Sequence, residues 1–416
     1  MRIALVVHQL PPEHLGGVEV YAWTLAQCLA EMGHQVAIFC PTARLDEAGE
    51  STADKVTLVR PYRPDPRSRW PLARFVNAFR SRSIERCYAA FVRSWQPDVV
   101  HLQHLQWVSA RLVRLHGRTP TVLTLHDYWH ICANSQLLRP GGQLCPGQAS
   151  AACARCLLEG SGVSPRVAAL ASWPLAPLLT WRNRFVRRSA LDVDQLLTPS
   201  PQAREVFLAA GFEAARLRSF DNGLDPSRLT GVTRPRPARS HTVFGYLGAL
   251  SWQKGLHVLV KAFDGLPAQH ELRIYGPQEA FPAYVQRLRA QSRHPGIRML
   301  GAVAPGSVGE VLAELDYLVV PSLWAETFGM VAQEAQHVGV PVIASRIGAL
   351  QRIRDGVDGH LFEPGDAEGL CRLMQHLVDH PAERDRLAAG IRLGPTIAAQ
   401  AQHLVKLYHD LIRRTL

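Results

Sequence analysis

The chain has 416 residues, of which 47% are hydrophobic and 19% are charged, and its formal net charge is +11. This composition excludes an intrinsically disordered protein, and the length predicts two or three globular domains. Apolar runs long enough for a membrane-spanning helix are absent from the sequence, and we expect no secretory signal. The positive charge favours an anionic partner such as a nucleotide or a phospholipid surface.

Short apolar runs alternate with a helical pattern in the first half of the chain. The run RIALVVHQL predicts a strand, apolar residues at helical spacing follow it from Val18 to Met32, and VAIFC predicts a second strand. A strand, a helix and a strand in this order are typical of a parallel sheet. The runs DVVHLQ, TVLTLH and QLLTPS continue the series, so we expect one α/β domain over residues 1–230.

The same pattern restarts after a linker rich in proline and arginine, Arg234–His241. Strands are predicted at TVFGYLGAL, ELRIYG, IRMLG, YLVVPS and VPVIAS, with helical segments between them. We therefore expect a second doubly wound domain over residues 231–395, and a closing helix over residues 396–416 that packs back on the first domain. Open α/β sheets bind ligands at the carboxyl ends of their strands, so a cleft between the two domains is the expected site.

Two glutamates, Glu326 and Glu334, flank the expected start of a helix in WAETFGMVAQEAQHVG. Glu326 falls in the turn after the strand YLVVPS, and the helix is expected to begin near Phe328. The free N–H groups from Thr327 to Met330, together with the helix dipole, suit a phosphate or diphosphate. Gly329 would let this ligand approach the backbone closely. A nucleotide sugar has the matching layout, with its sugar at Glu326, its diphosphate at the amides and its ribose at Glu334.

Six segments resemble, in the same order, those of the retaining glycosyltransferases of the GT-B fold, family 4. They are HQLPPEHLGGVEVYAWTLAQCLAEMGHQV, FDNGLD, YLGALSWQKGLHVLVKAF, PSLWAETFGMVAQEA with its E-x7-E signature, VPVIASRIGA and DGVDGHLFEPGD. The resemblance covers most of the chain. It implies two Rossmann-like domains that face each other across a cleft, with an acceptor-side N-terminal domain and a donor-binding C-terminal domain. It also implies a retaining enzyme that moves a sugar from a nucleotide-diphosphate sugar to a glycan or lipid-linked acceptor.

The resemblance implies roles for single residues as well. Lys254 would contact the donor diphosphate and stabilise the leaving group. The loop at Gly16 and Gly17 would let the backbone reach the phosphates, Gly276 would lie near the base, and His126 would lie beside the transferred sugar. No side chain is an obvious nucleophile. The resemblance implies a same-face substitution, which needs orientation and electrostatics but no metal.

One position departs from the family pattern. Many relatives carry an arginine where this chain has Ala249, so either Arg346 or another arginine compensates, or stabilisation of the leaving group is weaker. Two alternative functions stay open. One is a sugar phosphorylase or nucleotide-sugar epimerase of the same fold, and the other is a catalytically silent partner subunit that binds nucleotide sugar or lipid. Nothing beyond charge favours a nucleic-acid partner.

Four of the eight cysteines lie close together in the sequence. The segment 132–156, which is rich in glycine and proline at its centre, carries them with gaps of twelve, seven and two residues, at Cys132, Cys145, Cys153 and Cys156. Four thiolates in one loop fit a structural zinc ion. Free thiols, a disulfide between two of them and an iron–sulfur cluster are the alternatives.

Two segments of the first half predict contact with a membrane surface. Nine arginines lie between Arg60 and Trp95 with aromatic residues among them, which suits anionic lipid headgroups. The segment VAALASWPLAPLLTW is apolar, although Pro174 and Pro177 argue against a long helix there. We therefore expect a cytoplasmic enzyme, peripheral on the inner face of the cell membrane; an ordinary solvated helix with a buried apolar stripe is the alternative for the arginine-rich segment.

Overall fold

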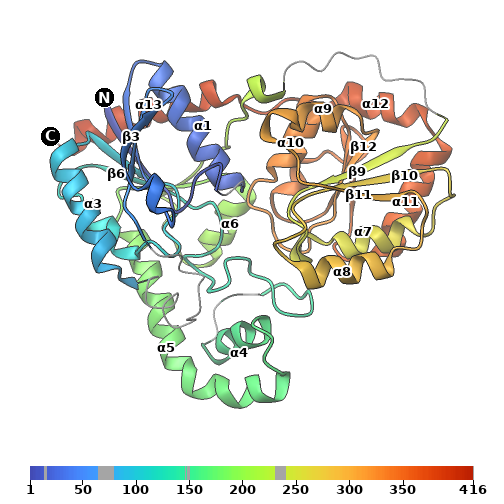
Figure 1. Ribbon diagram of the computed structural model, residues 1–416, viewed down its shortest axis with the longest axis horizontal. Coiled ribbons are helices and arrows are strands. Elements are labelled where there is room, and N and C mark those ends of the chain that lie inside the picture. Colours follow the sequence, from blue (N-terminus) through green and yellow to red (C-terminus); the bar gives the residue numbers. More distant parts are fainter. Residues whose placement is uncertain (14–15, 64–78, 146, 148–149, 230–239, 416) are drawn as a thin grey trace. The chain divides into compact units, whose positions relative to one another are not determined.

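The computed structural model describes residues 1–13, 16–63, 79–145, 147, 150–229 and 240–415 (Figure 1). The chain divides into two compact units. Unit 1 comprises Met1–Pro140, Cys145–Gly223 and Ile397–Leu416, and unit 2 comprises Gly141–Leu144 and Leu224–Thr396. The expected linker at 234–241 falls almost entirely outside the described residues.

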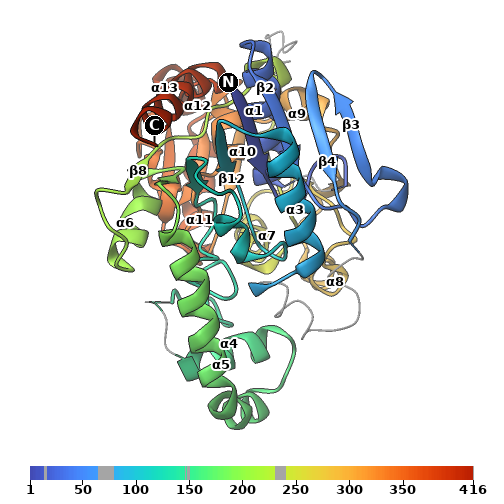
Figure 2. The ribbon, with the colours of Figure 1, turned by 90° about the vertical axis from the view of Figure 1, so that its left-hand side faces the viewer.

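Unit 1 is built on an eight-stranded sheet in the order β3-β4-β2-β1-β5-β6-β7-β8. All neighbouring strands are parallel except β3 and β4, which form an antiparallel pair at one edge (Figure 2). The strands are β1 (Arg2–Val6), β2 (Gln35–Phe39), β3 (Gly49–Ala53), β4 (Val56–Arg60), β5 (Val99–Leu102), β6 (Thr121–Thr124), β7 (Gln195–Thr198) and β8 (Leu217–Ser219). The helices are α1 (Gly17–Glu31), α3 (Arg82–Trp95), α4 (Ser150–Gly160), α5 (Pro165–Leu191), α6 (Pro201–Ala209) and α13 (Ile397–Thr415).

Unit 2 is built on a six-stranded parallel sheet in the order β11-β10-β9-β12-β13-β14. The strands are β9 (Val243–Leu247), β10 (Glu271–Tyr275), β11 (Ile297–Gly301), β12 (Tyr317–Val320), β13 (Val342–Ser345) and β14 (Gly359–Phe362). The helices are α7 (Leu256–Phe263), α8 (Pro282–Gln291), α9 (Val308–Ala313), α10 (Met330–His337), α11 (Ala367–Asp379) and α12 (Ala382–Gly390). The four residues of β12 are all buried, as expected for a central parallel strand covered on both faces.

The closing helix of the chain belongs to unit 1, as the sequence predicts. α13 packs against α1, and its Tyr408 hydroxyl lies 2.6 Å from Nδ1 of the buried His101 on β5. Gln400 on the same helix accepts a hydrogen bond from the Gly223 amide at 2.7 Å. Two parallel-sheet α/β units with this returning helix confirm the predicted fold class.

The expectation that two prolines would prevent a long helix is wrong. α5 runs for 27 residues through both Pro174 and Pro177. Each proline leaves unpaired the carbonyl four residues earlier. These carbonyls belong to Leu170 and Trp173, which are 79% and 76% exposed, so solvent can hydrate them. Among the described helices, none is long and apolar enough to cross a membrane.

Candidate active site

Glu326 lies in the loop after β12, where three donors hold its carboxylate. Lys254 Nζ, Ser322 Oγ and Trp324 Nε1 all donate to Glu326 Oε1, at 2.7, 2.6 and 2.9 Å. Lys254 comes from the short turn η4 (Trp252–Lys254), which follows β9, the neighbour of β12 in the sheet. Because Glu326 is only 6% exposed, the carboxyl ends of two adjacent strands carry a largely buried ion pair, and ligands of such sheets bind at this edge.

Glu334 lies in the second turn of α10, on the same loop-and-helix segment. It is 9% exposed, and no side chain of the described residues donates a hydrogen bond to its carboxylate. Burial raises the pKa of this carboxyl, although the positive charge of Arg228 acts in the opposite direction. Carboxylate oxygens accept hydrogen bonds, so Glu334 is suited to a ligand that brings hydroxyl groups.

The loop between the two glutamates ends in a glycine with left-handed backbone. Gly329 has a φ of 75° and caps α10, which begins at Met330, two residues later than the sequence predicts. Thr327 and Phe328 precede it and are buried. The Ala332 amide already donates to the Gly329 carbonyl at 3.0 Å, which leaves the Met330 and Val331 amides at the helix start without a backbone acceptor in the described residues. Together with the helix dipole they can bind an anion here.

A second close approach of backbone occurs at Gly276, which follows β10. A Cβ atom at this position would lie 2.0 Å from the carbonyl oxygen of Gly248, which follows the neighbouring strand β9. No side chain larger than hydrogen fits there. Gly276 therefore lets the chain after β10 pack closely against Gly248 and Leu250, in the segment that leads to Lys254.

The arginine expected to compensate for Ala249 is engaged elsewhere. Arg346 forms ion pairs with Asp355 at 2.7 Å and with Glu363 at 3.4 Å. Two arginines that sequence reasoning missed lie nearer the candidate site. The guanidinium of Arg352 lies 4.7 Å from the centroid of the Phe328 ring. The positive charge of Arg228 favours the ionised form of Glu334 and so opposes the rise of its pKa. Both arginines come from short 3₁₀ turns, η3 (Pro226–Leu229) and η6 (Gly348–Arg352), outside the E-x7-E segment, although Arg228 closely follows the FDNGLD segment.

In unit 1, the two predicted glycines lie at the N-terminus of α1. Gly16 is the N-cap and Gly17 the first helical residue. A Cβ atom on Gly16 would lie 2.3 Å from Glu19 Oε2, so the Glu19 carboxylate occupies the space that a larger side chain would take. That carboxylate is buried, which raises its pKa, and it lies 3.4 Å from His8 Nε2. Sequence reasoning missed both Glu19 and His8.

His126 follows β6 and is held as a neutral imidazole. Its Nε2 lies 2.8 Å from Gln103 Oε1, and its ring meets Tyr21 of α1 edge-on, with centroids 5.2 Å apart. Burial lowers the pKa of His126 to about 3. A neutral imidazole can donate one hydrogen bond and accept another, which suits contact with a sugar hydroxyl.

A buried charge pair that the sequence did not reveal stands beside His126. His104, two residues after β5, places Nε2 at 3.0 Å from Asp127 Oδ2, just after β6. Burial opposes the charged form of His104, but Asp127 and Glu19 outweigh it and raise its pKa; burial raises the pKa of Asp127, but His104 outweighs it and lowers that pKa. His8 stacks near His104, with ring centroids 4.5 Å apart. The carboxyl ends of β1, β5 and β6 therefore share one polar network.

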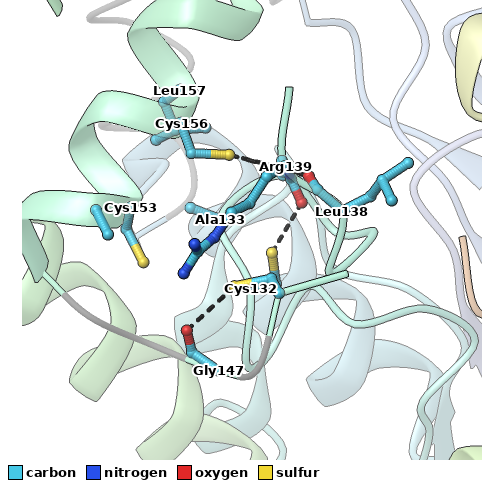
Figure 3. A pocket seen from close by; sticks show the side chains of 11 residues that line it. Cys132, Ala133, Leu138, Arg139, Gly147, Cys153, Cys156 and Leu157 are labelled. Atoms are coloured by element: carbon cyan, nitrogen blue, oxygen red, sulfur yellow. Dashed lines mark hydrogen bonds between the residues drawn. The ribbon is translucent and has the colours of Figure 1, made fainter. Parts of the chain in front are cut away.

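The four clustered cysteines line one cavity, together with Asn134 and Arg139 (Figure 3). None of the eight cysteines, all of which lie in the described part of the chain, forms a disulfide. Burial and the other three thiols of the cavity raise the pKa of Cys156 to about 11. As the side chains stand, no three His, Cys, Asp or Glu groups in the described ranges form a ready metal site.

The arginine-rich segment is described only in part, and its expected contact with a membrane surface stays a prediction. Four of its six described arginines are exposed, just before α3 or on it: Arg80, Arg82, Arg86 and Arg93. Arg60 is buried and paired with Glu13 and Glu47, and Arg63 is buried. Phe91 stacks on Phe39 in the core, with ring centroids 5.7 Å apart. Arg67, Arg69 and Arg74 lie outside the described residues.

Five exposed large apolar side chains of unit 1 lie on α5. They are Val167, Leu170, Trp173, Leu178 and Trp181. α5 packs against α4 at one end of the unit (Figures 1 and 2). The sequence singled out this segment, but the helix that presents it is longer than expected.

Comparison with known proteins links this geometry to a family. Residues 241–380 match the family profile described as Glycosyl transferases group 1. Glycogen synthase of Mycobacterium tuberculosis is 27% identical over 414 residues, covering 94% of this chain and 89% of that protein. D-inositol 3-phosphate glycosyltransferase of Xylanimonas cellulosilytica is 28% identical over 415 residues, covering 94% of this chain and 91% of that protein.

Solved structures share the fold. Sucrose-phosphate synthase from Thermosynechococcus elongatus has a TM-score of 0.70 at 20% identity and covers 99% of both chains. HepE of Anabaena in complex with UDP and glucose has a TM-score of 0.65 at 17% identity, covering 99% of this chain and 100% of that one. Residues 15–228, just over half of the chain, match the profile described as Glycosyltransferase Family 4. The chain therefore belongs to glycosyltransferase family 4.

Proposed function

We propose that this glycosyltransferase transfers a sugar from a nucleoside-diphosphate sugar to a glycan or lipid-linked acceptor with retention of configuration and without a catalytic metal. The observation that carries the proposal is the segment from Glu326 to Glu334. This segment begins with the Glu326 carboxylate, which Lys254 holds. The amides at the start of α10 follow, and then the buried carboxylate of Glu334. The HepE complexes with UDP and UDP-glucose, and starch synthase IV bound to ADP, are of the same fold.

Each part of the donor then has a partner. The ribose hydroxyls donate to Glu334, and the diphosphate takes the first-turn amides of α10 and the ammonium of Lys254. Since three donors already hold Glu326 Oε1, we assign its other oxygen to a sugar hydroxyl. Negative charge that develops on the leaving diphosphate is stabilised by Lys254 and the helix start.

In unit 1 we assign His126 to a hydroxyl of the transferred sugar. Its low pKa keeps the ring neutral at physiological pH, so it serves as a hydrogen-bonding group rather than as a cation. The leaving phosphate oxygen accepts the proton of the attacking acceptor hydroxyl, on the face from which the diphosphate departs. The protein thus contributes orientation and electrostatics.

Nucleotide binding and turnover of the purified protein test the proposal together. A screen of UDP, ADP and GDP should give one thermal shift well above the others, with about 2.7 kcal/mol of stabilisation at 100 times the Kd. Lys254→Ala should reduce both this shift and donor consumption, whereas Lys261→Ala, on the exposed face of α7, should change neither.

The alternatives give different outcomes in the same assay. Product configuration, read by NMR, should match that of the donor, and an inverted product would contradict the retaining mechanism. Conversion of the donor without an acceptor would indicate an epimerase. Nucleotide binding with no consumption of any donor would indicate a silent partner subunit.

We also propose that unit 1 contacts an anionic membrane surface through α5. The supporting observation is the exposure of Leu170 and Trp173 on this helix, which also carries the exposed arginines Arg166 and Arg184. Exposed apolar patches flanked by basic residues bind the interface of anionic bilayers. The attraction of each arginine is about 1 kcal/mol and weakens with salt.

Sedimentation with anionic vesicles measures this contact. The protein should pellet with phosphatidylglycerol vesicles at low ionic strength, and the variant Leu170→Ser/Trp173→Ser should stay in the supernatant. Leu45→Ser is the matched control, because Leu45 is 72% exposed but lies on the turn η1 (Leu45–Glu47) away from α5. Equal pelleting of all three proteins would exclude α5 as the contact.

A further inference from the structure

The cavity lined by four cysteines brings together two parts of unit 1. Cys153 and Cys156 lie one turn apart on α4, so their side chains share one face of the helix. Cys132 and Cys145 come from the preceding loop. The cavity has a volume of about 20 Å³ in which the centre of a water molecule can lie. It can therefore hold a single small occupant. Figure 3 shows Cys132, Cys153 and Cys156 around it.

The loop half of the cavity is held by hydrogen bonds close to the sulfur atoms. The Cys132 amide donates to the Tyr128 carbonyl, and the Cys145 amide donates to the Leu137 carbonyl, both at 2.7 Å. The side-chain amide of Asn134 joins the loop to the helix: its Oδ1 accepts from Cys132 Sγ at 2.8 Å, and its Nδ2 donates to Cys156 Sγ at 3.5 Å. N–H donation to sulfur is the contact that a thiolate ligand requires from its surroundings.

A buried positive charge lies beside the cavity. Arg182 of α5 is 3% exposed and donates to the Trp129 carbonyl and to Asn183 Oδ1, but it forms no ion pair with a carboxylate of the described residues. Cys132 and Cys153 are among the groups that act on it electrostatically. The Asp127 carboxylate also acts on Arg182 and favours its charged form, and thiolates at the cavity would add to this stabilisation of a buried cation. Arg139, which lines the cavity, adds a second cation.

We propose that Cys132, Cys145, Cys153 and Cys156 bind one Zn²⁺ ion in a structural site. Each thiol loses its proton to solvent and forms one zinc–sulfur bond, so that four thiolates and one Zn²⁺ carry a net charge of −2. This anionic centre places negative charge near Arg182 and Arg139. Tetrahedral coordination by four thiolates leaves no open position, which is typical of structural rather than catalytic zinc.

The contacts of the sulfur atoms identify what must change when zinc binds. Cys132 Sγ donates to Asn134, and Cys145 Sγ donates to the Gly147 carbonyl at 3.2 Å. These two bonds need the thiol protons and are lost on deprotonation. Rotation about χ1 then turns both sulfurs toward the cavity, where the Asn134 amide still donates to Cys156.

The site would fasten α4 to the loop that begins at the polar network of unit 1. This loop starts directly after Asp127, and its first turn contains the buried Trp129. Four of its residues, Gly141–Leu144, group with unit 2. A zinc ion between Cys132 and α4 would therefore stiffen the segment next to His126 without touching the donor. This inference does not depend on the donor assignment above.

Metal analysis of the full-length protein, purified without added metal, tests the proposal. We expect about one zinc per chain and no iron, release of the zinc when a mercurial blocks the thiols, and a lower Tm afterwards. Cobalt reconstitution of the demetallated protein should give the visible absorption of a tetrahedral thiolate site. Cys153→Ser and Cys156→Ser should each lose zinc, whereas Cys87→Ser and Cys371→Ser, outside the cavity, should keep it.

Other results overturn the proposal. Folded protein without metal, with all thiols open to a thiol reagent, leaves only free thiols. A disulfide detected within 132–156 in freshly purified protein, or iron with the absorbance of a cluster, assigns the cysteines to a different chemistry. If Cys153→Ser does not fold, zinc content, mercurial release and the cobalt spectrum of the unaltered protein decide the matter alone.

Discussion

Lys254 and Glu326 form an ion pair in which the two charges neutralise each other. Lys254 Nζ lies 2.7 Å from Glu326 Oε1, and the Glu326 side chain is buried. The ammonium also lies 5.3 Å from the centroid of the Trp324 ring. If Lys254 binds the diphosphate, as we propose, the incoming phosphate competes with Glu326 for the same cation. The two glutamates of the motif should then respond in opposite ways to the loss of their charge.

Replacing Glu326 with Gln should therefore separate binding from turnover. Without its carboxylate partner, Lys254 is released to the phosphate, so nucleoside-diphosphate affinity should stay the same or rise while turnover falls. Replacing Glu334 with Ala should weaken the nucleotide by about 1.5–3 kcal/mol, because the ribose hydroxyls lose a charged acceptor. This is roughly a 10- to 150-fold rise in Kd. Calorimetric titration of both variants measures it, and unchanged affinity of Glu334→Ala would contradict the ribose assignment.

At the scale of elements, the start of α10 depends on one left-handed residue. Gly329 has a φ of 75°, and a Cβ atom there would lie 2.9 Å from Leu350 Cδ2. An alanine must either adopt an unfavourable backbone, at about 1–2 kcal/mol, or shift the first turn of the helix. Such a shift would displace the amides that we assign to the diphosphate.

The variant Gly329→Ala should accordingly lose both stability and nucleotide affinity. Gly356→Ala is the matched control, because Gly356 has a φ of 70° but a Cβ atom there would meet no other atom within 4 Å. Gly356→Ala therefore has the backbone strain but no steric contact such as the one with Leu350. Thermal unfolding and nucleotide titration of the pair separate the two effects, and equal affinity in both variants would remove the helix start from the phosphate site.

The elements themselves were largely predictable from the sequence, and the polar partners were not. Apolar runs and helical spacing identify β1, α1, β12 and α10, because local sequence sets periodicity. Lys254, Glu326 and Glu334 were found because they belong to one recognisable pattern. His104 and Asp127 were missed as a pair, since they come from different strands that only the sheet order brings together. Arg60 was misjudged for the same reason, because its partners Glu13 and Glu47 are distant in sequence.

At the scale of the whole molecule, three buried neutral histidines make the stability of unit 1 depend on pH. Burial lowers the pKa of His101, His126 and His130 to about 3, whereas the unfolded chain protonates them near pH 6.5. The unfolded state thus binds more protons between these values, so stability falls as the pH drops through this window. His104, whose pKa is raised, opposes the trend with a contribution that is present at low pH and lost as the pH rises.

We expect the free energy of unfolding of unit 1 to fall between pH 7 and pH 5, by up to about 1.4 kcal/mol per pH unit for each of the three histidines. Urea unfolding followed by circular dichroism at each pH measures the slope. His130→Gln removes one of the groups that take up a proton on unfolding, so the slope should fall by up to about 1.4 kcal/mol per pH unit. The replacement breaks no hydrogen bond of Nε2, which has no partner among the described residues. A stability that is constant from pH 7 to pH 5 would contradict the neutral buried state.

The return of α13 to unit 1 determines the order in which the chain can be completed during synthesis. The ribosome delivers the eight strands of the unit 1 sheet first, but the helix whose Tyr408 meets His101 on β5 comes last. Unit 2 lies between them in the sequence, so it can finish folding on the nascent chain while the α1 face of unit 1 still lacks its cover. A message that terminates before codon 397 would therefore yield an intact unit 2 attached to a unit 1 that cannot close its core.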